Sequence, residues 1–336
     1  MLKVGFTFDL RSDYLAMGMS EEETAEFDSA VTIDAIEATL KRQGFAVDRI
    51  GHVQNLIKRL AQGHRWDLVF NICEGLKGLA REAQVPAILE AFDIPYVFSD
   101  PLTLAAALDK AMTKNIVRAA GVPTPDFAVV SSSSDVAAID LPFPLFVKPI
   151  GEGSGKGVSA RSHVTDTAAL KRECLRLLEE FNQPVLVETF ASGREFTVGI
   201  TGTGGDASIL GVMEVLPNQN AQAHGYGFDN KENYEGRYDY RLASDPEAQE
   251  AGQVALAAYR AMRCRDGGRV DIRSDSAGRP QFIEVNPLAG LNPERSDLIF
   301  IARFAGITFD QLIGRIMSSC LKRYPSLANK KTGTFA

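Results

Sequence analysis

The chain has 336 residues, more than a single hydrophobic core usually serves, so we expect two or three domains with a cleft between them. Its 36 basic and 43 acidic residues give a net charge of -7. The sequence shows no basic stripe and no basic run interleaved with aromatic residues, which argues against nucleic acid as the main ligand. No apolar run is long enough to span a bilayer, the four cysteines are scattered, and the first residues enter a strand pattern directly. These features predict a cytoplasmic protein with reduced thiols and no membrane partner.

Residues 2–97 alternate short apolar segments with amphipathic helices, a pattern that predicts an open parallel α/β sheet. The expected strands cover residues 4–8, 46–50, 68–72 and 96–98. The expected helices cover residues 30–43, 56–60 and 86–92. We assign this unit to an N-terminal α/β domain over residues 1–98.

A second unit, over residues 99–190, surrounds a glycine-rich loop at 151–157. A helix is expected at 104–120, because Gly121 and two nearby prolines form a stop signal. The other elements expected in this unit are strands at 145–149 and 185–188 and a helix at 167–181.

A third unit, over residues 191–325, is followed by a tail at 326–336. Its expected elements are strands at 195–201 and 209–215, helices at 246–262 and 309–321, and a hairpin at 268–287. A polar loop from residue 216 to about residue 243 separates the two strands from the first of these helices.

The hairpin places polar side chains on two neighbouring strands. Side chains alternate between the faces of a strand, so Arg269 and Asp271 share one face. On the second strand, Glu284 and Asn286 share a face opposite the apolar Ile283. We therefore expect two carboxylates, an amide and a guanidinium in one patch.

The turn of this hairpin is expected to be centred between Ala277 and Gly278, which would place Asp271 opposite Glu284. Hard oxygen ligands suit Mg²⁺, which keeps several waters and shares the rest of its shell with phosphate. The hairpin therefore predicts a magnesium-nucleotide site. The alternative is an ordinary half-exposed hairpin with solvated charges.

The glycine-rich loop can present backbone N–H groups to phosphate. It fits neither the Walker nor the GxGxxG pattern, which leaves a hairpin lid between strands at 145–148 and 158–161, or else a flexible surface turn. Lys148 ends an apolar strand, which predicts an anionic partner. Lys110, on its helix, is either a ligand contact or a solvated side chain.

Six short segments, in order and at compatible spacings, resemble the ATP-grasp superfamily and, within it, the D-alanine:D-alanine ligases, over residues 1–325. They lie at 107–110 (Ala-Leu-Asp-Lys), 146–154 (Phe-Val-Lys-Pro through Glu-Gly-Ser), 185–188 (Val-Leu-Val-Glu), 193–198 (Gly-Arg-Glu-Phe-Thr-Val), 268–271 (Gly-Arg-Val-Asp) and 284–287 (Glu-Val-Asn-Pro). The resemblance implies an α/β fold of the α+β ATP-grasp type. It has three domains, a Rossmann-like N-terminal domain and a two-part module that holds ATP between two sheets.

The resemblance also implies roles for individual residues on the nucleotide side. The residues that match contacts to the phosphates are Lys110, Lys148, Gly153 and Ser154. Those that match the adenine-facing hinge are Glu188, Thr189 and Ala191, and Glu195 matches the carboxylate that binds the ribose hydroxyls. Those matching ligands of Mg²⁺, for which Mn²⁺ is an alternative, are Asp271, Glu284 and Asn286. Those matching catalytic groups are Arg269 and the Gly290 N–H, which stabilise the transferring phosphoryl group and the oxyanion, together with Ser154.

The activity implied is that of an ATP-dependent carboxylate–amine ligase. A carboxylate attacks the γ-phosphate of ATP, and an amine then displaces phosphate from the acyl phosphate to give an amide. Two D-alanines are the best match as substrates. The alternatives are a different amino acid, a peptide or a secondary metabolite, or a non-catalytic ATP-binding protein. The family also implies small-molecule substrates, a homodimer, and a lid over the site that includes residues 234–238.

The substrate side departs from the family pattern. After the last metal ligand the family has Asn-Thr-x-Pro-Gly-Met-Thr, whereas here Gly290 stays but its surroundings differ. Either Arg295 or Ser296 would hold an acceptor carboxylate, while Glu294 would select a cationic group instead. The family's N-terminal His-Gly motif is replaced by residues 71–75.

Two further segments are substrate candidates. Glu26 and Asp28 either contact a substrate or favour the dipole of the following helix. Tyr238 and Ser154 match a hydrogen-bonded substrate pair, with a register that neighbouring tyrosines leave open.

Overall fold

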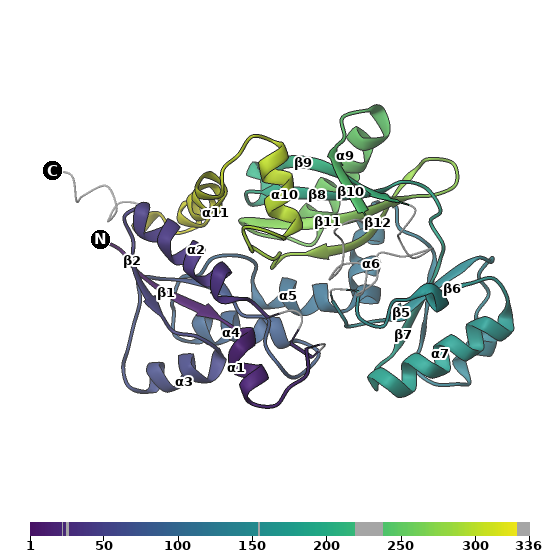
Figure 1. Ribbon diagram of the computed structural model, residues 1–336, viewed down its shortest axis with the longest axis horizontal. Helices are drawn as coiled ribbons and strands as arrows, with labels where there is room; N and C mark the ends of the chain where they lie inside the picture. The colour runs from purple at the N-terminus through teal and green to yellow at the C-terminus, as the bar shows by residue number, and fades with distance from the viewer. Residues whose placement is uncertain (22, 25–26, 154, 219–237, 328–336) are drawn as a thin grey trace.

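The structure is a computed structural model that describes residues 1–21, 23–24, 27–153, 155–218 and 238–327. It contains three sheets that follow one another along the chain, with helices packed on them (Figure 1). None of the helices described is long and apolar enough to cross a membrane.

The N-terminal sheet is parallel, as predicted. The central strand β1 (Lys3–Phe8) pairs with β2 (Ala46–Arg49) on one side and with β3 (Leu68–Ile72) on the other. The helices of this part are α1 (Arg11–Ala16), α2 (Ala30–Arg42), α3 (Val53–Ala61), the short 3-10 helix η1 (Arg81–Ala83) and α4 (Gln84–Ala91). The strand expected at 96–98 is wrong: only an isolated bridge joins Tyr96 to Val69, and the φ of Phe98, 76°, ends the extended backbone.

The helix expected at 104–120 is divided in two. The helices α5 (Pro101–Leu108) and α6 (Lys110–Ala119) meet at Asp109, whose carboxylate accepts the N–H of Met112. A carboxylate in this position caps a helix N-terminus, so a new helix begins at Lys110. The break buries the Lys110 side chain beside the glycine-rich loop, which excludes a solvated lysine at this position.

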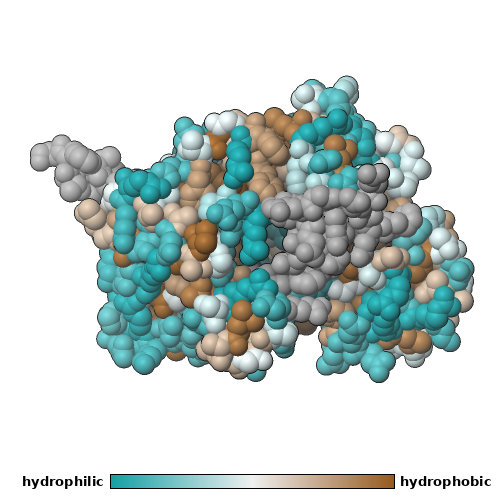
Figure 2. All heavy atoms as spheres, viewed as in Figure 1, coloured by the Kyte–Doolittle hydropathy of each residue, from teal (hydrophilic) through white to brown (hydrophobic). Residues whose placement is uncertain are grey.

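The central sheet is antiparallel, with the strand order β4-β7-β5-β6. Its elements are β4 (Phe127–Val130), the short helix η2 (Asp135–Ala138), β5 (Leu145–Pro149), β6 (His163–Val164), α7 (Thr167–Phe181) and β7 (Val185–Thr189). Leu170, Cys174 and Leu177 of α7 pack against Val147 and Val185 of the sheet. The visible outer surface over α7 is largely hydrophilic, as expected for a helix with one apolar face (Figure 2).

The strand expected at 158–161, after the glycine-rich loop, is wrong. The short helix η3 (Ala160–Ser162) begins there, because the Ser159 hydroxyl accepts the N–H of Arg161 and the Ser162 hydroxyl accepts the N–H of Ser159. The strand that returns to β5 is β6, which follows this helix.

The C-terminal sheet has five antiparallel strands in the order β10-β9-β8-β11-β12. In chain order its elements are β8 (Glu195–Thr201), η4 (Gly204–Asp206), β9 (Ser208–Pro217), β10 (Tyr238–Leu242), α9 (Pro246–Ala261), β11 (Gly267–Ser274), β12 (Pro280–Asn286), α10 (Asp297–Phe304) and α11 (Phe309–Arg323). Val198 and Ile200 of β8 join the core with α9. Gly199, between them, faces α10, where a Cβ would lie 3.0 Å from Ile301. The absence of a side chain at Gly199 lets α10 pack directly on the sheet.

The polar loop expected at 216–243 is shorter at both ends. β9 extends to Pro217, and β10 begins at Tyr238, which pairs with Pro217. Residues 219–237 lie outside the described residues. They include 234–237, all of the predicted lid segment except Tyr238.

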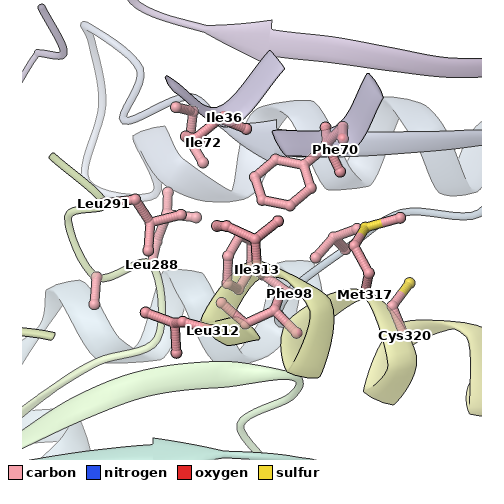
Figure 3. Packing of buried hydrophobic residues seen from close by; sticks show 14 of the residues in the cluster. Ile36, Phe70, Ile72, Phe98, Leu288, Leu291, Leu312, Ile313, Met317 and Cys320 are labelled. Carbon is pink, nitrogen blue, oxygen red and sulfur yellow. The ribbon is translucent and has the colours of Figure 1, made fainter. Parts of the chain in front are cut away.

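One hydrophobic core joins the N-terminal sheet to the C-terminal part of the chain. Ile313 and Met317 of α11 lie beside Phe70 of β3 in this core (Figure 3). Leu288 and Leu291 belong to the same core, so it anchors the segment that follows β12. This segment carries Gly290 and leads to α10.

Candidate active site

The hairpin of β11 and β12 has the pairing predicted at its inner end. Asp271 lies opposite Glu284, and Arg269 lies opposite Asn286. All four side chains are partly buried, while Val270 between them is fully buried in the core. The charged face of the hairpin therefore points away from the core under α9.

A β-bulge in the hairpin corrects two details of the prediction. Beyond it, Ser274 lies opposite Pro280, so the turn is centred on residue 277 rather than between 277 and 278. The bulge skips Ile283, and its side chain lines the same cavity as Glu284 instead of lying on the apolar face. An inserted residue interrupts the alternation of a strand in this way.

A cavity of about 120 Å³ lies between the central and C-terminal sheets, and we call it the nucleotide cavity. The residues predicted for the nucleotide side that line it are Lys110, Lys148, Glu188, Thr189, Ala191, Glu195, Arg269, Asp271 and Glu284. Phe146, Phe190 and Ile283 add apolar surface. Apolar walls beside convergent charges are the combination that a purine base and its phosphates require.

Lys148 has the anionic partner predicted for it. Its Nζ lies 2.7 Å from Oε1 of Glu188, and the Nζ of Lys114 lies 2.8 Å from Oε2 of the same carboxylate. All three side chains are buried. Burial by itself would raise the pKa of Glu188, but the two ammonium groups outweigh burial and hold this pKa at about 2.

The two lysines of this cluster respond differently to burial. Burial lowers the pKa of Lys114 to about 8, because the attraction of Glu188 only partly offsets it. Burial also opposes the charge of Lys148, but Glu188 and Glu284 outweigh burial and raise the pKa of this lysine. Near neutral pH, two ammonium groups and one carboxylate leave the cluster with one net positive charge, next to the nucleotide cavity.

Arg269 lies among three carboxylates. Its guanidinium pairs with Asp271 and lies 3.8 Å from Asp297. Burial would lower the pKa of Arg269, but Asp271, Asp297 and Glu284 outweigh burial and raise it. A buried guanidinium that keeps its charge can stabilise negative charge that develops on a reacting group.

Asp271, Glu284 and Asn286 can hold Mg²⁺ only together with other oxygens. Within the described ranges, no group of three or more His, Cys, Asp or Glu side chains is placed to hold a metal ion. Asp271 accepts the Thr197 hydroxyl at 3.0 Å, which orients its carboxylate. The buried Nδ2 of Asn286 has no hydrogen-bond partner in the described part of the chain. Two carboxylates and the amide oxygen of Asn286 fit Mg²⁺ when phosphate oxygens and water complete its shell, and the unpaired Nδ2 can donate to one of those oxygens.

The glycine-rich loop lies against Lys110. The Nζ of Lys110 donates to the carbonyl oxygen of Glu152 at 2.5 Å and lies 3.7 Å from Oε2 of Glu284. Gln183 holds the loop from α7's side, accepting the N–H of Gly151 and donating to the Glu152 carboxylate, both at 2.7 Å. Gly153, predicted on the nucleotide side, lines the neighbouring cavity.

A second cavity, of about 240 Å³, lies beside the first, and we call it the substrate cavity. Its charged residues outside the nucleotide cavity are Asp28, Glu74, Arg81, Glu82 and Arg295. The residues that line both cavities are Lys110, Glu152, Arg269, Glu284 and Asp297. The two cavities therefore meet at the hairpin and the glycine-rich loop.

The residues predicted for the substrate side have different outcomes. Gly290, Arg295 and Ser296 line the substrate cavity, together with Asn286. Tyr238 is buried on β10 and is not among the residues that line either cavity, whereas Tyr240 lines the substrate cavity. Glu26 and Ser154 lie outside the described residues.

Asp28 borders the substrate cavity just before α2. Burial raises the pKa of its carboxyl group to about 7, and Asp9 adds to this effect, while Thr32 and Arg295 oppose it. Asn292 donates to the Thr32 hydroxyl at 3.1 Å and so ties the segment after β12 to the start of α2. A carboxyl group that titrates near neutrality at the edge of a cavity is stabilised in its ionised form by a cationic ligand.

Sequence reasoning missed several residues of the site. Lys114 follows Lys110 by four positions and precedes Val117 by three, so helical spacing places it on the buried stripe of α6 and could have identified it. Asp297 begins α10, a helix that was not expected, and no signal pointed to it. Glu74 follows β3, in the segment noted only as a departure from the family pattern, and Arg81 begins the short helix η1, where no motif pointed to it.

The fold and the two joined cavities define the ATP-grasp class of ATP-dependent ligases. The crystal structure of D-alanine–D-alanine ligase from Bacillus anthracis complexed with ATP superimposes with a TM-score of 0.70 at 24% identity, covering 96% of this chain and 98% of that one. At this identity the likeness establishes the fold. The family described as "D-ala D-ala ligase C-terminus" matches residues 116–318.

Sequence relatives extend this match. The D-alanine–D-alanine ligase of Alcanivorax borkumensis is 30% identical over 313 residues, which is 92% of this chain and 93% of that protein. The enzyme of the same name from Aquifex aeolicus is 34% identical over 254 residues, 75% of this chain and 82% of its own. The chain therefore belongs to the D-alanine:D-alanine ligase family, as the sequence motifs predicted, and it is an ATP-dependent ligase that acts on small molecules.

Proposed function

We propose that this chain joins the carboxylate of one small amino acid to the amine of a second, using ATP with Mg²⁺ and releasing ADP and phosphate. Two D-alanines are the first substrates to test, because the relatives carry the name D-alanine–D-alanine ligase. The proposal rests on the family and on the contact between the two cavities.

The observation that carries the proposal is the set of residues shared by the two cavities. Arg269 and Glu284 border both the nucleotide cavity and the substrate cavity. A carboxylate bound in the substrate cavity would thus face the same groups as the terminal phosphate of a nucleotide. This arrangement is what phosphoryl transfer to a carboxylate requires.

A carboxylate is a poor electrophile until one of its oxygens carries a phosphoryl group. Bound Mg-ATP would supply that group and neutralise its charge. Lys148 and Arg269 would hold and orient the phosphates, and Lys110 would hold the glycine-rich loop over them. Because the acyl phosphate is sensitive to water, the glycine-rich loop held over the phosphates would also exclude solvent.

The second half-reaction needs donors for the developing oxyanion. We assign this role to the Arg269 guanidinium and the Gly290 N–H. A Cβ at residue 290 would lie 2.9 Å from the Ser296 hydroxyl, so glycine keeps this wall open. Asp28 would hold an ammonium group, and Arg295 or Ser296 a carboxylate.

An amino acid with a charged side chain is a second candidate substrate. Glu74, Arg81 and Glu82 line the substrate cavity in addition to Asp28 and Arg295. A methyl side chain needs no such groups, whereas a charged side chain would find partners of opposite sign among them.

Phosphate release tests the proposal. Pairs of D- and L-amino acids, including acidic and basic ones, should be screened for release of phosphate above the rate with ATP alone. We expect release that requires both amino acids and Mg²⁺, and its loss in Asp271→Asn with the melting temperature retained. If ATP binds but no pair of amino acids raises the release above background, ligation of amino acids is the wrong function.

A further inference from the structure

A buried lysine lies behind the nucleotide cavity. Lys148 and Glu188 line this cavity, but Lys114 is not among the residues that line either cavity. Lys114 is fully buried, at 0% exposure, and its closest acidic partner is Glu188. It therefore cannot act on a bound nucleotide by direct contact.

Three contacts fix the position of Lys114. Its Nζ donates to the Thr124 hydroxyl at 2.9 Å and to the carbonyl oxygen of Phe282, on β12, at 3.4 Å. Together with the Glu188 contact from β7, these bonds place the ammonium group where the central and C-terminal sheets meet. The charge is thus held in place whether or not Lys148 moves.

One carboxylate with two ammonium partners is unusual, because a single lysine would neutralise it. Lys148 has a second set of anions near it, Glu284 and Asp271, and lines the cavity that we assign to ATP. If Lys148 turns to a phosphate, a buried Glu188 with no other partner would be left as an isolated anion, which is strongly unfavourable.

We propose that Lys114 is a positioning residue that keeps Glu188 neutralised while Lys148 transfers its contact from Glu188 to the phosphates of the nucleotide. The inference rests on the proposed nucleotide site and adds to it a reason for the second lysine. In this view Lys114 contributes to ATP affinity through Glu188 alone.

The test measures ATP dissociation constants by calorimetry with the full-length protein and Mg²⁺. Lys114→Met should weaken ATP binding about 10- to 100-fold, the loss seen when a residue that orients a metal-binding side chain is removed. In a Glu188→Gln background there is no anion to neutralise, so adding Lys114→Met should change the ATP affinity less than about threefold. Lys171→Met, on the exposed surface of α7, is the control and should bind ATP like the parent protein.

A purely structural role for Lys114 predicts a different pattern. In that case Lys114→Met would weaken ATP binding as much with Gln at position 188 as with Glu, and this result would overturn the proposal. Unchanged affinity in Lys114→Met would overturn it too. If Lys114→Met does not fold, the comparison between Glu188→Gln and the double variant still decides the question, because both lack the unpaired anion. Failure of the parent protein itself to bind ATP would instead reject the proposed nucleotide site.

Discussion

The two cavities of this ligase are built from different kinds of structure. The nucleotide cavity is walled mainly by strands of two sheets, β5 and β7 on one side and β8, β11 and β12 on the other. Its charged groups are paired with one another, as in Lys148 with Glu188 and Arg269 with Asp271. The substrate cavity is walled mainly by the segments before α2, after β3 and after β12. Strands carry most of the residues that match the family pattern, and loops carry most of those that depart from it.

This contrast explains why the family pattern is preserved on one side and lost on the other. A substitution at a paired, buried charge leaves its partner unsatisfied and is strongly destabilising. A substitution in a loop at the cavity edge changes contacts with a substrate and leaves the fold intact.

Arg269→Met should remove turnover. The guanidinium is the one group in the hairpin that we assign to both half-reactions, and removing an arginine that stabilises a transferring phosphoryl group lowers kcat by about 10³-fold or more. Single-turnover phosphate release measures the effect. Arg279→Met, at the exposed tip of the same hairpin, is the control and should keep the parent rate. Retention of more than about a tenth of the turnover in Arg269→Met would remove this residue from the mechanism.

Glu188 should stabilise the fold in a pH-dependent way. Its folded-state pKa of about 2 lies below the ordinary value of 4.5, so the stabilisation is complete above about pH 4.5 and is lost as the pH falls toward 2. This pKa difference corresponds to a contribution on the order of 3 kcal/mol to the free energy of unfolding. In urea unfolding between about pH 5 and pH 3, the free energy of unfolding should fall less with decreasing pH in Glu188→Gln than in the parent.

The control for this measurement is Glu179→Gln, whose side chain is exposed on α7. It should keep the parent's loss of stability in acid. Equal slopes for the parent and Glu188→Gln would mean that the two lysines do not hold the carboxylate ionised.

Arg295→Ala should affect substrate binding more than turnover. If the guanidinium holds the carboxylate of the second amino acid, its loss should raise the KM for that substrate about tenfold, the effect of one charge-assisted hydrogen bond, with a smaller change in kcat. Glu294→Ala, next to it but not among the residues lining the cavity, should change neither. A KM that rises in Ser296→Ala and not in Arg295→Ala would assign the carboxylate to Ser296.

Asp28 should make substrate use depend on pH. Its carboxyl group has a pKa of about 7, raised mainly by burial, so it becomes an anion as the pH rises through neutrality and can then hold an ammonium group. At saturating ATP, kcat/KM for the amino acid should rise several-fold between about pH 6 and pH 8. Asp28→Asn should flatten this rise, and an unchanged profile in that variant would exclude Asp28 as the origin.

Much of the fold could be predicted from the sequence where local signals and packing agree. The strands β3 and β8 and the helix α7 match their predicted bounds, because a short, largely buried run or a helical periodicity is bounded by polar or turn residues. The errors have local causes that periodicity does not show. The Asp109 cap divided a helix, a bulge moved Ile283 into the nucleotide cavity, and the capped turn at Ser159 replaced a strand.

The site could be predicted to a different degree on its two sides. The pairing of Asp271 with Glu284 follows from strand register, and the anionic partner of Lys148 follows from its burial. Lys114 was missed because a lysine on a helix is ordinarily solvated, and its partner lies 74 residues further along the chain, at position 188. The substrate cavity combines segments that are distant in sequence, whose meeting depends on the shared core around α11.

The most direct test of the account follows an oxygen atom. The amino acid that donates the carboxylate should be supplied with isotopically labelled oxygen in that group, and the phosphate released during ligation should be analysed by mass spectrometry. If the carboxylate attacks the terminal phosphate of ATP, one labelled oxygen should appear in each phosphate released, in step with the peptide formed. Peptide formation with unlabelled phosphate would contradict the acyl phosphate route and, with it, the joined roles of the two cavities.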